Sequence, residues 1–192
     1  MTPQKENDKF HDPLEALERL LSHFDHQGVV IGGVAASLIG QARFTDDLDA
    51  MVLLSLNEIP QFLEVAENEE IEPRIPQAED FARQNRILLL RHIPSHTDID
   101  ISMGVLPFEE EVVQRRVVHE IDETLNVHLP TPEDLIIMKA IAHRPKDLMD
   151  IQGIIQSHPD LDMDRIQDWV TQFADLLDMP ELWEDIADWL KG

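Results

Sequence analysis

Four aspartates in two short apolar segments have the spacing that metal chemistry needs. Asp47 and Asp49 open the segment DLDAMVLL, and Asp98 and Asp100 lie within TDIDI. In a β-strand, residues two positions apart point to the same face, so each pair would project its carboxylates together. Adjacent carboxylates repel each other and are costly to desolvate, and a divalent cation between them offsets both effects. Because hard oxygen ligands at this spacing suit Mg²⁺, we expect a metal site at the first pair, joined by one or both members of the second.

Two glycines precede the first aspartate pair. Gly32 and Gly33 follow the apolar triplet VVI, and residues 34–46 separate them from Asp47. Backbone N–H groups at a glycine-rich helix start can approach a phosphate closely, and the helix dipole favours an anion there. The glycines would then hold the phosphate and the aspartates the metal. Taken singly, these patterns also fit a solvated turn or a solvent-facing hairpin edge in an acidic protein. Their order and separation favour the combined site.

The segments that must position these residues alternate between strand and helix patterns. An amphipathic helix is predicted from Asp12-Pro13 to Gly28, and the polar residues 57–86, interrupted by three prolines, favour helices. Residues 87–91 and 97–102 are expected to form a hairpin. The other expected elements are strands at 29–31, 48–54, 117–118 and 125–129 and helices at 34–39 and 109–116.

From Thr131 onward the pattern contains helices only. Thr131 is a predicted N-cap, with Pro132 at the first helical position and Asp134 three residues after the cap. The segment KDLMDIQGIIQ predicts a further helix, followed by two acidic amphipathic helices whose tryptophans we expect to pack in a core. We therefore predict an α+β domain at residues 1–129 and a helical region at residues 130–192.

Composition narrows the classes of function. The 192 residues include 15 Lys and Arg against 39 Asp and Glu, a formal net charge of −24, which argues against binding a long nucleic-acid duplex. The chain has no cysteine, so disulfides and thiolate metal sites are excluded. The apolar runs are too short to span a membrane, and MTPQKENDKFHDP has no apolar stretch typical of a secretory signal. We expect a cytoplasmic protein.

The nine histidines carry no metal motif. His23 with His26, and His92 with His96, are spaced as pairs, but neither pair has the third ligand that a zinc site needs nearby in the sequence. We expect ordinary surface or half-buried histidines. G-x-S-x-G, P-loop and G-x-G-x-x-G patterns are absent from the sequence, which leaves hydrolase, Walker-type ATPase and Rossmann functions without their motifs.

Three segments carry a resemblance to a known superfamily. VVIGGVAASLIGQARFTDDLDAMVLL, with the later DID, resembles the signature of the DNA polymerase β-like nucleotidyltransferases. Within it, RFTDDLD is similar to the bacterial AbiEii/AbiGii-toxin-like nucleotidyltransferases, and PEDLIIMKAIAHRPKDLMDI resembles a helical segment of that group. The resemblance implies a nucleotidyltransferase fold of the α+β class: a mixed, twisted β-sheet flanked by helices, followed by a C-terminal helical region.

The resemblance also implies roles for single residues. Asp47 and Asp49 match the metal-binding pair, Asp100 best matches the third carboxylate, with Asp98 as the alternative, and Lys139 matches a lysine that contacts substrate phosphates. A solvated helix end is the structural alternative for Lys139 and the basic residues after it. The implied nucleotide-binding residues are Gly32, Gly33, Arg43, Thr45, Arg144, Lys146 and Asp147.

The implied activity is transfer of an NMP from an NTP to an acceptor hydroxyl, with Mg²⁺ or Mn²⁺ as cofactor. The acceptor alternatives are a tRNA 3′ end, a protein and a small molecule, and the chain would be the toxin of a toxin–antitoxin pair with a cognate antitoxin as partner. The alternative function is a catalytically inactive nucleotidyltransferase-fold module that binds a partner as an antitoxin or adaptor.

Overall fold

The computed structural model describes residues 4–190, which form two compact units. One unit contains the described residues up to Val34 together with Phe44–Leu129. The other contains Ala35–Arg43 and the described residues from Pro130 onward. Residues 35–43 thus pack with the C-terminal helices, although they lie between two strands in the sequence. That residues 1–129 and 130–192 fold as separate domains stays a prediction.

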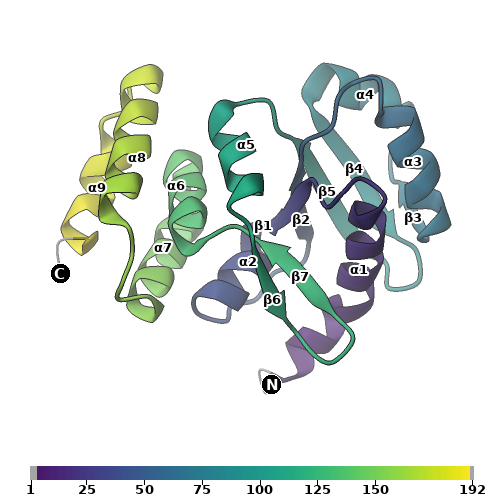
Figure 1. Ribbon diagram of the computed structural model, residues 1–192, viewed down its shortest axis with the longest axis horizontal. Helices are drawn as coiled ribbons and strands as arrows, with labels where there is room; N and C mark the ends of the chain where they lie inside the picture. The colour runs from purple at the N-terminus through teal and green to yellow at the C-terminus, as the bar shows by residue number, and fades with distance from the viewer. Residues whose placement is uncertain (1–3, 191–192) are drawn as a thin grey trace. The chain divides into compact units, whose positions relative to one another are not determined.

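A sheet of five strands lies in the first unit, and Figure 1 shows helices packed around it. Its β2 and β5 are parallel neighbours, and its other neighbouring pairs are antiparallel. This arrangement confirms the predicted α+β class with a mixed sheet and the predicted hairpin of β4 and β5. In spatial order the strands are β1 (Gly28–Ile31), β2 (Leu48–Val52), β5 (Thr97–Met103), β4 (Ile87–His92) and β3 (Ile71–Pro73).

Strand β5 shows why apolar and acidic residues alternate in TDIDI. Ile99 and Ile101 are fully buried, whereas Asp98 and Asp100 are half-buried on the opposite face. Because side chains alternate between the faces of a strand, the isoleucines anchor the strand and the aspartates are presented away from that core.

Several helices of the first unit pack against its strands (Figure 1). Helix α1 packs against β2, α3 against β3, and α4 against β4. Helix α1 begins earlier than the Asp12-Pro13 start predicted from proline placement. Phe10 extends the buried stripe of Leu14, Leu17 and Leu21, and that burial outweighs the hydrogen bond lost at Pro13. The helices are α1 (Gln4–Ser22), α3 (Ile59–Asn68), α4 (Ala78–Asn85) and α5 (Pro107–Gln114).

The first unit also contains a short edge strand and a separate two-stranded hairpin. The edge strand β3 lies within residues 57–86, where helices were expected. It has three residues, ends on a proline and buries only Ile71, so it carries too little strand pattern to be predicted. The expected strand pair after α5 is confirmed as an antiparallel hairpin of β6 (Val117–Glu120) and β7 (Asn126–Leu129).

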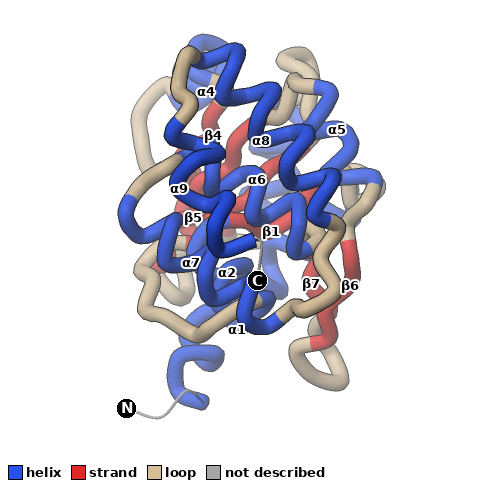
Figure 2. Tube along the Cα trace, turned by 90° about the vertical axis from the view of Figure 1, so that its left-hand side faces the viewer, coloured by secondary structure: helices blue, strands red, loops and turns tan. Residues whose placement is uncertain are grey.

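The second unit is helical, and Figure 2 shows its helices side by side. The predicted N-cap of its first helix is confirmed, because the backbone N–H of Asp134 donates to Thr131 Oγ1 at 3.2 Å. None of the described helices combines the length and apolarity that a membrane span requires. The unit comprises the later part of α2 (Gly32–Ile39) with α6 (Pro132–Ala142), α7 (Pro145–Ser157), α8 (Met163–Leu177) and α9 (Glu181–Leu190).

Candidate active site

Asp49 and Asp100 lie side by side on two parallel strands of the first unit. Asp49 of β2 is the register partner of Asp100 of β5, so both side chains leave the same face of the sheet. Both residues are half-buried. Asp47 directly precedes β2 and is also half-buried. Each of the two strands therefore presents one carboxylate, and Asp47 adds a third directly before β2.

The pKa of Asp100 reflects this crowding. Burial raises the pKa of Asp100 above its ordinary value, and the charges of Asp47 and Asp98 raise it further, whereas the charge and hydrogen bond of Arg74 lower it. Like charges in partial burial disfavour the ionised form. The site thus has an excess of negative charge that a divalent cation would neutralise.

Asp98 is engaged differently from Asp100. Arg91 Nε donates to Asp98 Oδ1 at 2.6 Å, and an Arg74 Nη atom donates to Oδ2 at 2.8 Å. The hydrogen bond from Arg91 holds the pKa of Asp98 below its ordinary range. Both of its oxygens are already bound by cations, so the geometry favours Asp100 as the third carboxylate.

Thr45 positions Asp47. Its hydroxyl donates to Asp47 Oδ1 at 3.1 Å, and it lies two residues earlier in the chain. This contact restricts the rotation of the Asp47 carboxylate. Thr45 was predicted from the resemblance as a nucleotide-binding residue, and its observed contact is with the neighbouring aspartate.

Gly32 is packed directly against Asp49. Its backbone is left-handed, with φ at +66°, and a Cβ atom at this position would lie 1.9 Å from Asp49 Oδ2. Only glycine satisfies both conditions. Gly33 is buried beside it in the first turn of α2. The structure therefore brings the predicted phosphate glycines next to the predicted metal carboxylates.

Arg74 is a residue of this site that the sequence did not indicate. One of its Nη atoms donates to Asp98 and the other to Asp100 Oδ1, while its Nε is buried without a hydrogen-bond partner among the described residues. The guanidinium supplies positive charge to the carboxylate group. Arg74 directly follows the short strand β3 in a polar stretch, where no spacing distinguishes it from a surface arginine.

A second group of predicted site residues lies in the helical unit. Lys139 is almost completely buried, and its Nζ lies 2.7 Å from Asp150 and 3.2 Å from Asp147. Burial opposes ionisation of Asp147, but the hydrogen bond from Arg144 and the charge of Lys139 outweigh it and lower its pKa. The two carboxylates balance the positive charge of the buried lysine and hold its side chain in position.

Each of these two carboxylates also holds an arginine. Arg43 Nε and one Nη donate to the two oxygens of Asp150 at 2.6 and 3.0 Å. Arg144 Nε donates to Asp147 Oδ2 at 2.5 Å. The side chain of Arg144 is 57% exposed, and Lys146 is exposed too.

The predicted site residues thus fall into two groups, one in each unit. The first unit contains Gly32, Gly33, Thr45, Asp47, Asp49 and Asp100. The second unit brings together Arg43, Lys139, Arg144 and Asp147, joined by Asp150, and it also contains the exposed Lys146. The catalytic and binding roles assigned to these residues stay predictions.

Solved structures share the fold of the whole chain. An antigenic nucleotidyltransferase-like protein from Paracoccidioides brasiliensis matches with a TM-score of 0.57 and 16% identity, over 97% of this chain and 94% of the other. The antibiotic-resistance factor ANT(2'')-Ia matches with a TM-score of 0.55 and 13% identity, over 88% of this chain and 95% of the other. At these identities the likeness shows the fold alone.

Comparison with curated proteins finds no significant match. A family profile described as nucleotidyltransferase of unknown function (DUF6036) matches residues 8–184. The similarity to AbiEii/AbiGii-like proteins stays a prediction. The profile spans most of both units, including the carboxylates of β2 and β5 and the charged residues of α6 and α7. The chain therefore belongs to the nucleotidyltransferase family DUF6036.

Proposed function

We propose that this protein is a metal-dependent nucleotidyltransferase that transfers an NMP from an NTP to an acceptor hydroxyl. The observation that carries the proposal is the register pairing of Asp49 with Asp100, beside Asp47 and against Gly32. A shared face of half-buried carboxylates, one with a raised pKa, has the donor chemistry that suits Mg²⁺ or Mn²⁺. Asp47, Asp49 and Asp100 would hold the metal.

When bound, the divalent cation would neutralise phosphate charge and favour ionisation of the attacking hydroxyl. The chain's own residues supply the positioning. Thr45 keeps the Asp47 carboxylate oriented, and the left-handed backbone of Gly32 leaves room for Asp49. Backbone N–H groups in the first turn of α2 are suited to the triphosphate.

In the proposed reaction, the acceptor oxygen forms a bond to the α-phosphorus and the bond to pyrophosphate breaks. The hydroxyl proton passes to a nearby carboxylate, for which we propose Asp100, and then to solvent. Because phosphoryl-type transfer needs little covalent participation by the enzyme, alignment and charge stabilisation provide most of the acceleration.

The residues of the second unit enter the proposal in two roles. Arg144 and Lys146 are exposed and suited to nucleotide phosphates, although Asp147 also binds the Arg144 guanidinium. Lys139 and Arg43, predicted to contact substrate, are held by Asp147 and Asp150, so we assign them a positioning role within the helical unit.

A labelling assay with a matched pair of variants tests the activity. The purified protein is incubated with each labelled NTP, Mg²⁺ or Mn²⁺, and a cell lysate that supplies tRNA, proteins and small molecules. Asp47→Asn should lower transfer at least about 100-fold, because loss of a metal ligand exceeds the usual cost of an outer contact. Asp46→Asn is the control. Asp46 directly precedes Asp47 in the chain, but its side chain is 80% exposed and lies 3.5 Å from Lys9 Nζ.

The outcome also separates the alternatives. Label that appears on RNA, protein or a small molecule, and disappears only in Asp47→Asn, supports the enzyme. Binding of metal and nucleotide without any transfer would contradict it and favour an inactive antitoxin or adaptor module. The net charge of −24 argues against a long duplex as acceptor.

The similarity of RFTDDLD to the AbiEii/AbiGii-like group supports a further part of the proposal, that the protein is a toxin with a cognate antitoxin and acts in the cytoplasm. Expression of the wild-type protein in bacteria should then arrest growth, whereas Asp47→Asn should not. Equal growth of both strains at equal protein levels would contradict the toxin role while leaving the transferase activity to the labelling assay.

A further inference from the structure

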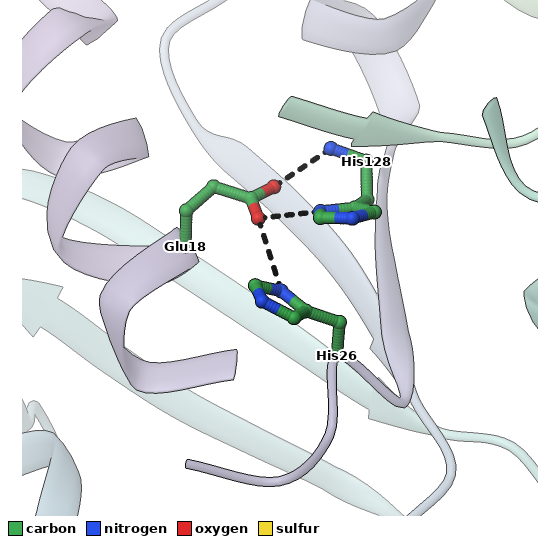
Figure 3. Close-up of side chains that lie close together, drawn as sticks. All are labelled: Glu18, His26 and His128. Carbon is green, nitrogen blue, oxygen red and sulfur yellow. Dashed lines mark hydrogen bonds and ion pairs between the residues drawn. The ribbon is translucent and has the colours of Figure 1, made fainter. Parts of the chain in front are cut away.

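Glu18, His26 and His128 meet at one point of the first unit although they come from three separate segments (Figure 3). Glu18 lies on α1, His26 in the turn between α1 and β1, and His128 on β7. One potential ligand atom of each lies within 4.8 Å of those of the other two. The set combines one carboxylate with two imidazoles, which is a donor combination found in zinc proteins.

The Glu18 carboxylate is held in a fixed orientation. Its side chain is 8% exposed, and its Oε1 accepts the backbone N–H of His128 at 2.8 Å. Its Oε2 lies 2.7 Å from His128 Nδ1 and 3.6 Å from His26 Nδ1 (Figure 3). One oxygen is thus anchored by the backbone, while the other faces both imidazole rings. Such an outer hydrogen bond orients a carboxylate ligand toward a metal.

His26 is incompletely satisfied in this arrangement. Its Nδ1 atom is buried and has no hydrogen-bond partner among the described residues, because 3.6 Å to Glu18 exceeds hydrogen-bond distance. A buried polar atom without a partner calls for an explanation, and a metal ion bound between this nitrogen and the Glu18 carboxylate would supply one.

The backbone at His26 is also unusual. Asp25 and His26 both have left-handed conformations, with φ values of 52° and 49°. Non-glycine residues occupy this region at some cost in free energy, and such residues are common where a side chain must be aimed. The turn brings the His26 ring within 4.4 Å of the His128 ring, centroid to centroid.

We propose that Glu18, His26 and His128 bind Zn²⁺ through Oε2 and the two Nδ1 atoms. Zinc bonds of about 2.0–2.2 Å place tetrahedral neighbours about 3.3 Å apart, and the observed separations of 2.7 and 3.6 Å lie on either side of that spacing. Small rotations of the two rings complete the geometry. Three protein ligands leave the fourth position for water.

This site is separate from the proposed catalytic carboxylates. His26 lies two residues before the start of β1, whereas Gly32 follows the other end of the strand and packs against Asp49. Four strand residues span about 13 Å. Zinc here would join α1, the turn after it and the β6–β7 hairpin, so its effect is on the stability of the first unit. The inference does not depend on the proposed function.

Metal binding by the 192-residue protein tests the proposal without an activity assay. After treatment with a chelator and its removal, the protein is titrated with Co²⁺ and then with Zn²⁺. We expect one equivalent of Co²⁺ to give the intense visible absorption of tetrahedral coordination, and Zn²⁺ to displace it. We also expect Zn²⁺ to raise the unfolding temperature, because a ligand that binds only the folded state stabilises it.

Variants identify the ligands. His26→Gln and His128→Gln should each weaken Zn²⁺ binding by at least about tenfold and abolish the tetrahedral Co²⁺ spectrum, since each removes one of three ligands. His23→Gln should bind as the wild type does, because His23 belongs to the same turn region but is 55% exposed and faces Glu69. Circular dichroism confirms that each variant is folded.

Three results would overturn the proposal. The first is the absence of a tetrahedral Co²⁺ spectrum in the wild-type protein. The second is unchanged binding in both folded histidine variants. The third is loss of the bound ion in Asp47→Asn but not in His26→Gln, which would place the ion at the aspartates.

Discussion

The Cα of Gly32 lies against the carboxylate of Asp49, so close that a methyl group there would overlap Oδ2 at 1.9 Å. The first turn of α2 and the first residues of β2 are thereby fitted to each other. Gly32→Ala should destabilise the fold by about 1–2 kcal/mol through its left-handed backbone alone, and displacement of Asp49 adds to this. Transfer activity should fall about 100-fold, because a shift near 1 Å suffices for such a loss.

Denaturant unfolding and the labelling assay check this prediction, and a double-variant cycle supplies the control. In an Asp49→Gly background the side chain that overlaps the new methyl group is gone. Gly32→Ala should therefore cost less stability there than in the wild-type protein. An equal loss of stability in both backgrounds would show that overlap with the Asp49 side chain is not what excludes a side chain at residue 32.

Asp100 should make the metal-free protein less stable as the pH rises. Its folded pKa lies above the usual 3.8, chiefly through burial, so the folded state holds its proton more tightly than the unfolded state. The free energy of unfolding then falls as the pH rises from 3.8 through the folded pKa. Asp100→Asn removes this loss, so the variant should gain stability relative to the wild type across that range and keep the gain at neutral pH.

Asp98→Asn is the matched control with the opposite sign. The folded pKa of Asp98 is depressed by the hydrogen bond from Arg91, so its ionised form stabilises the fold above the usual pKa. The variant should be less stable than the wild type at neutral pH, and the difference should fade as the pH falls through the folded pKa. Urea unfolding in the presence of a chelator measures both profiles. Parallel profiles for the two variants would contradict the assignment.

The alternation in TDIDI and the glycine–aspartate order were sufficient to predict the strands that carry the site. Ile99 and Ile101 must face a core, so Asp98 and Asp100 had to share the other face. The choice between these two aspartates needed the structure, because it depends on arginines from other elements. Arg91 comes from the paired strand β4, and Arg74 follows β3.

Contacts between distant segments account for the rest of what the sequence did not reveal. The sequence offered a phosphate contact or a solvated helix end for Lys139. The solvated end is wrong, because Lys139 is buried against Asp147 and Asp150 of the next helix. The histidine spacing suggested only local pairs, whereas His26 lies beside His128 from the far hairpin. Local periodicity carries no information on such pairings.

Arg74 should couple the stability of the site to Mg²⁺. Its guanidinium holds Asp98 and Asp100 and competes with a metal for the Asp100 carboxylate. Arg74→Gln should cost the metal-free protein about 1–2 kcal/mol, the usual value of partly buried hydrogen bonds to charged groups. It should also increase the stabilisation by Mg²⁺, because repulsion grows and the competitor is lost.

Thermal unfolding with and without Mg²⁺ tests this coupling. Arg91→Gln is the comparison. Arg91 lies opposite Asp98 in the pairing of β4 with β5 and donates a hydrogen bond to Asp98 rather than to Asp100. The increase in unfolding temperature on adding Mg²⁺ should be larger for Arg74→Gln than for Arg91→Gln or the wild type. A smaller increase for Arg74→Gln would instead show that Arg74 assists metal binding.

Lys139 should contribute more to stability than any exposed lysine of the helical unit. Lys139→Met removes one counter-charge from the buried Asp147 and Asp150, which then depend on Arg144 and Arg43 among the described residues. Breaking a buried charge network in this way costs about 3–5 kcal/mol. Lys146→Met, one turn from Asp150 but exposed, should change stability by less than about 0.5 kcal/mol. Urea unfolding of both variants measures the difference.

A second substitution separates this positioning role from direct contact with a substrate phosphate. Asp150→Asn added to Lys139→Met removes one uncompensated charge, so it should restore part of the lost stability, whereas Asp150→Asn alone should destabilise the protein. Independent, additive costs for the two substitutions would contradict the charge network. A stable Lys139→Met protein with weakened NTP binding would return Lys139 to the role of a phosphate contact, because a residue held only by Asp147 and Asp150 cannot be lost without a cost in folding.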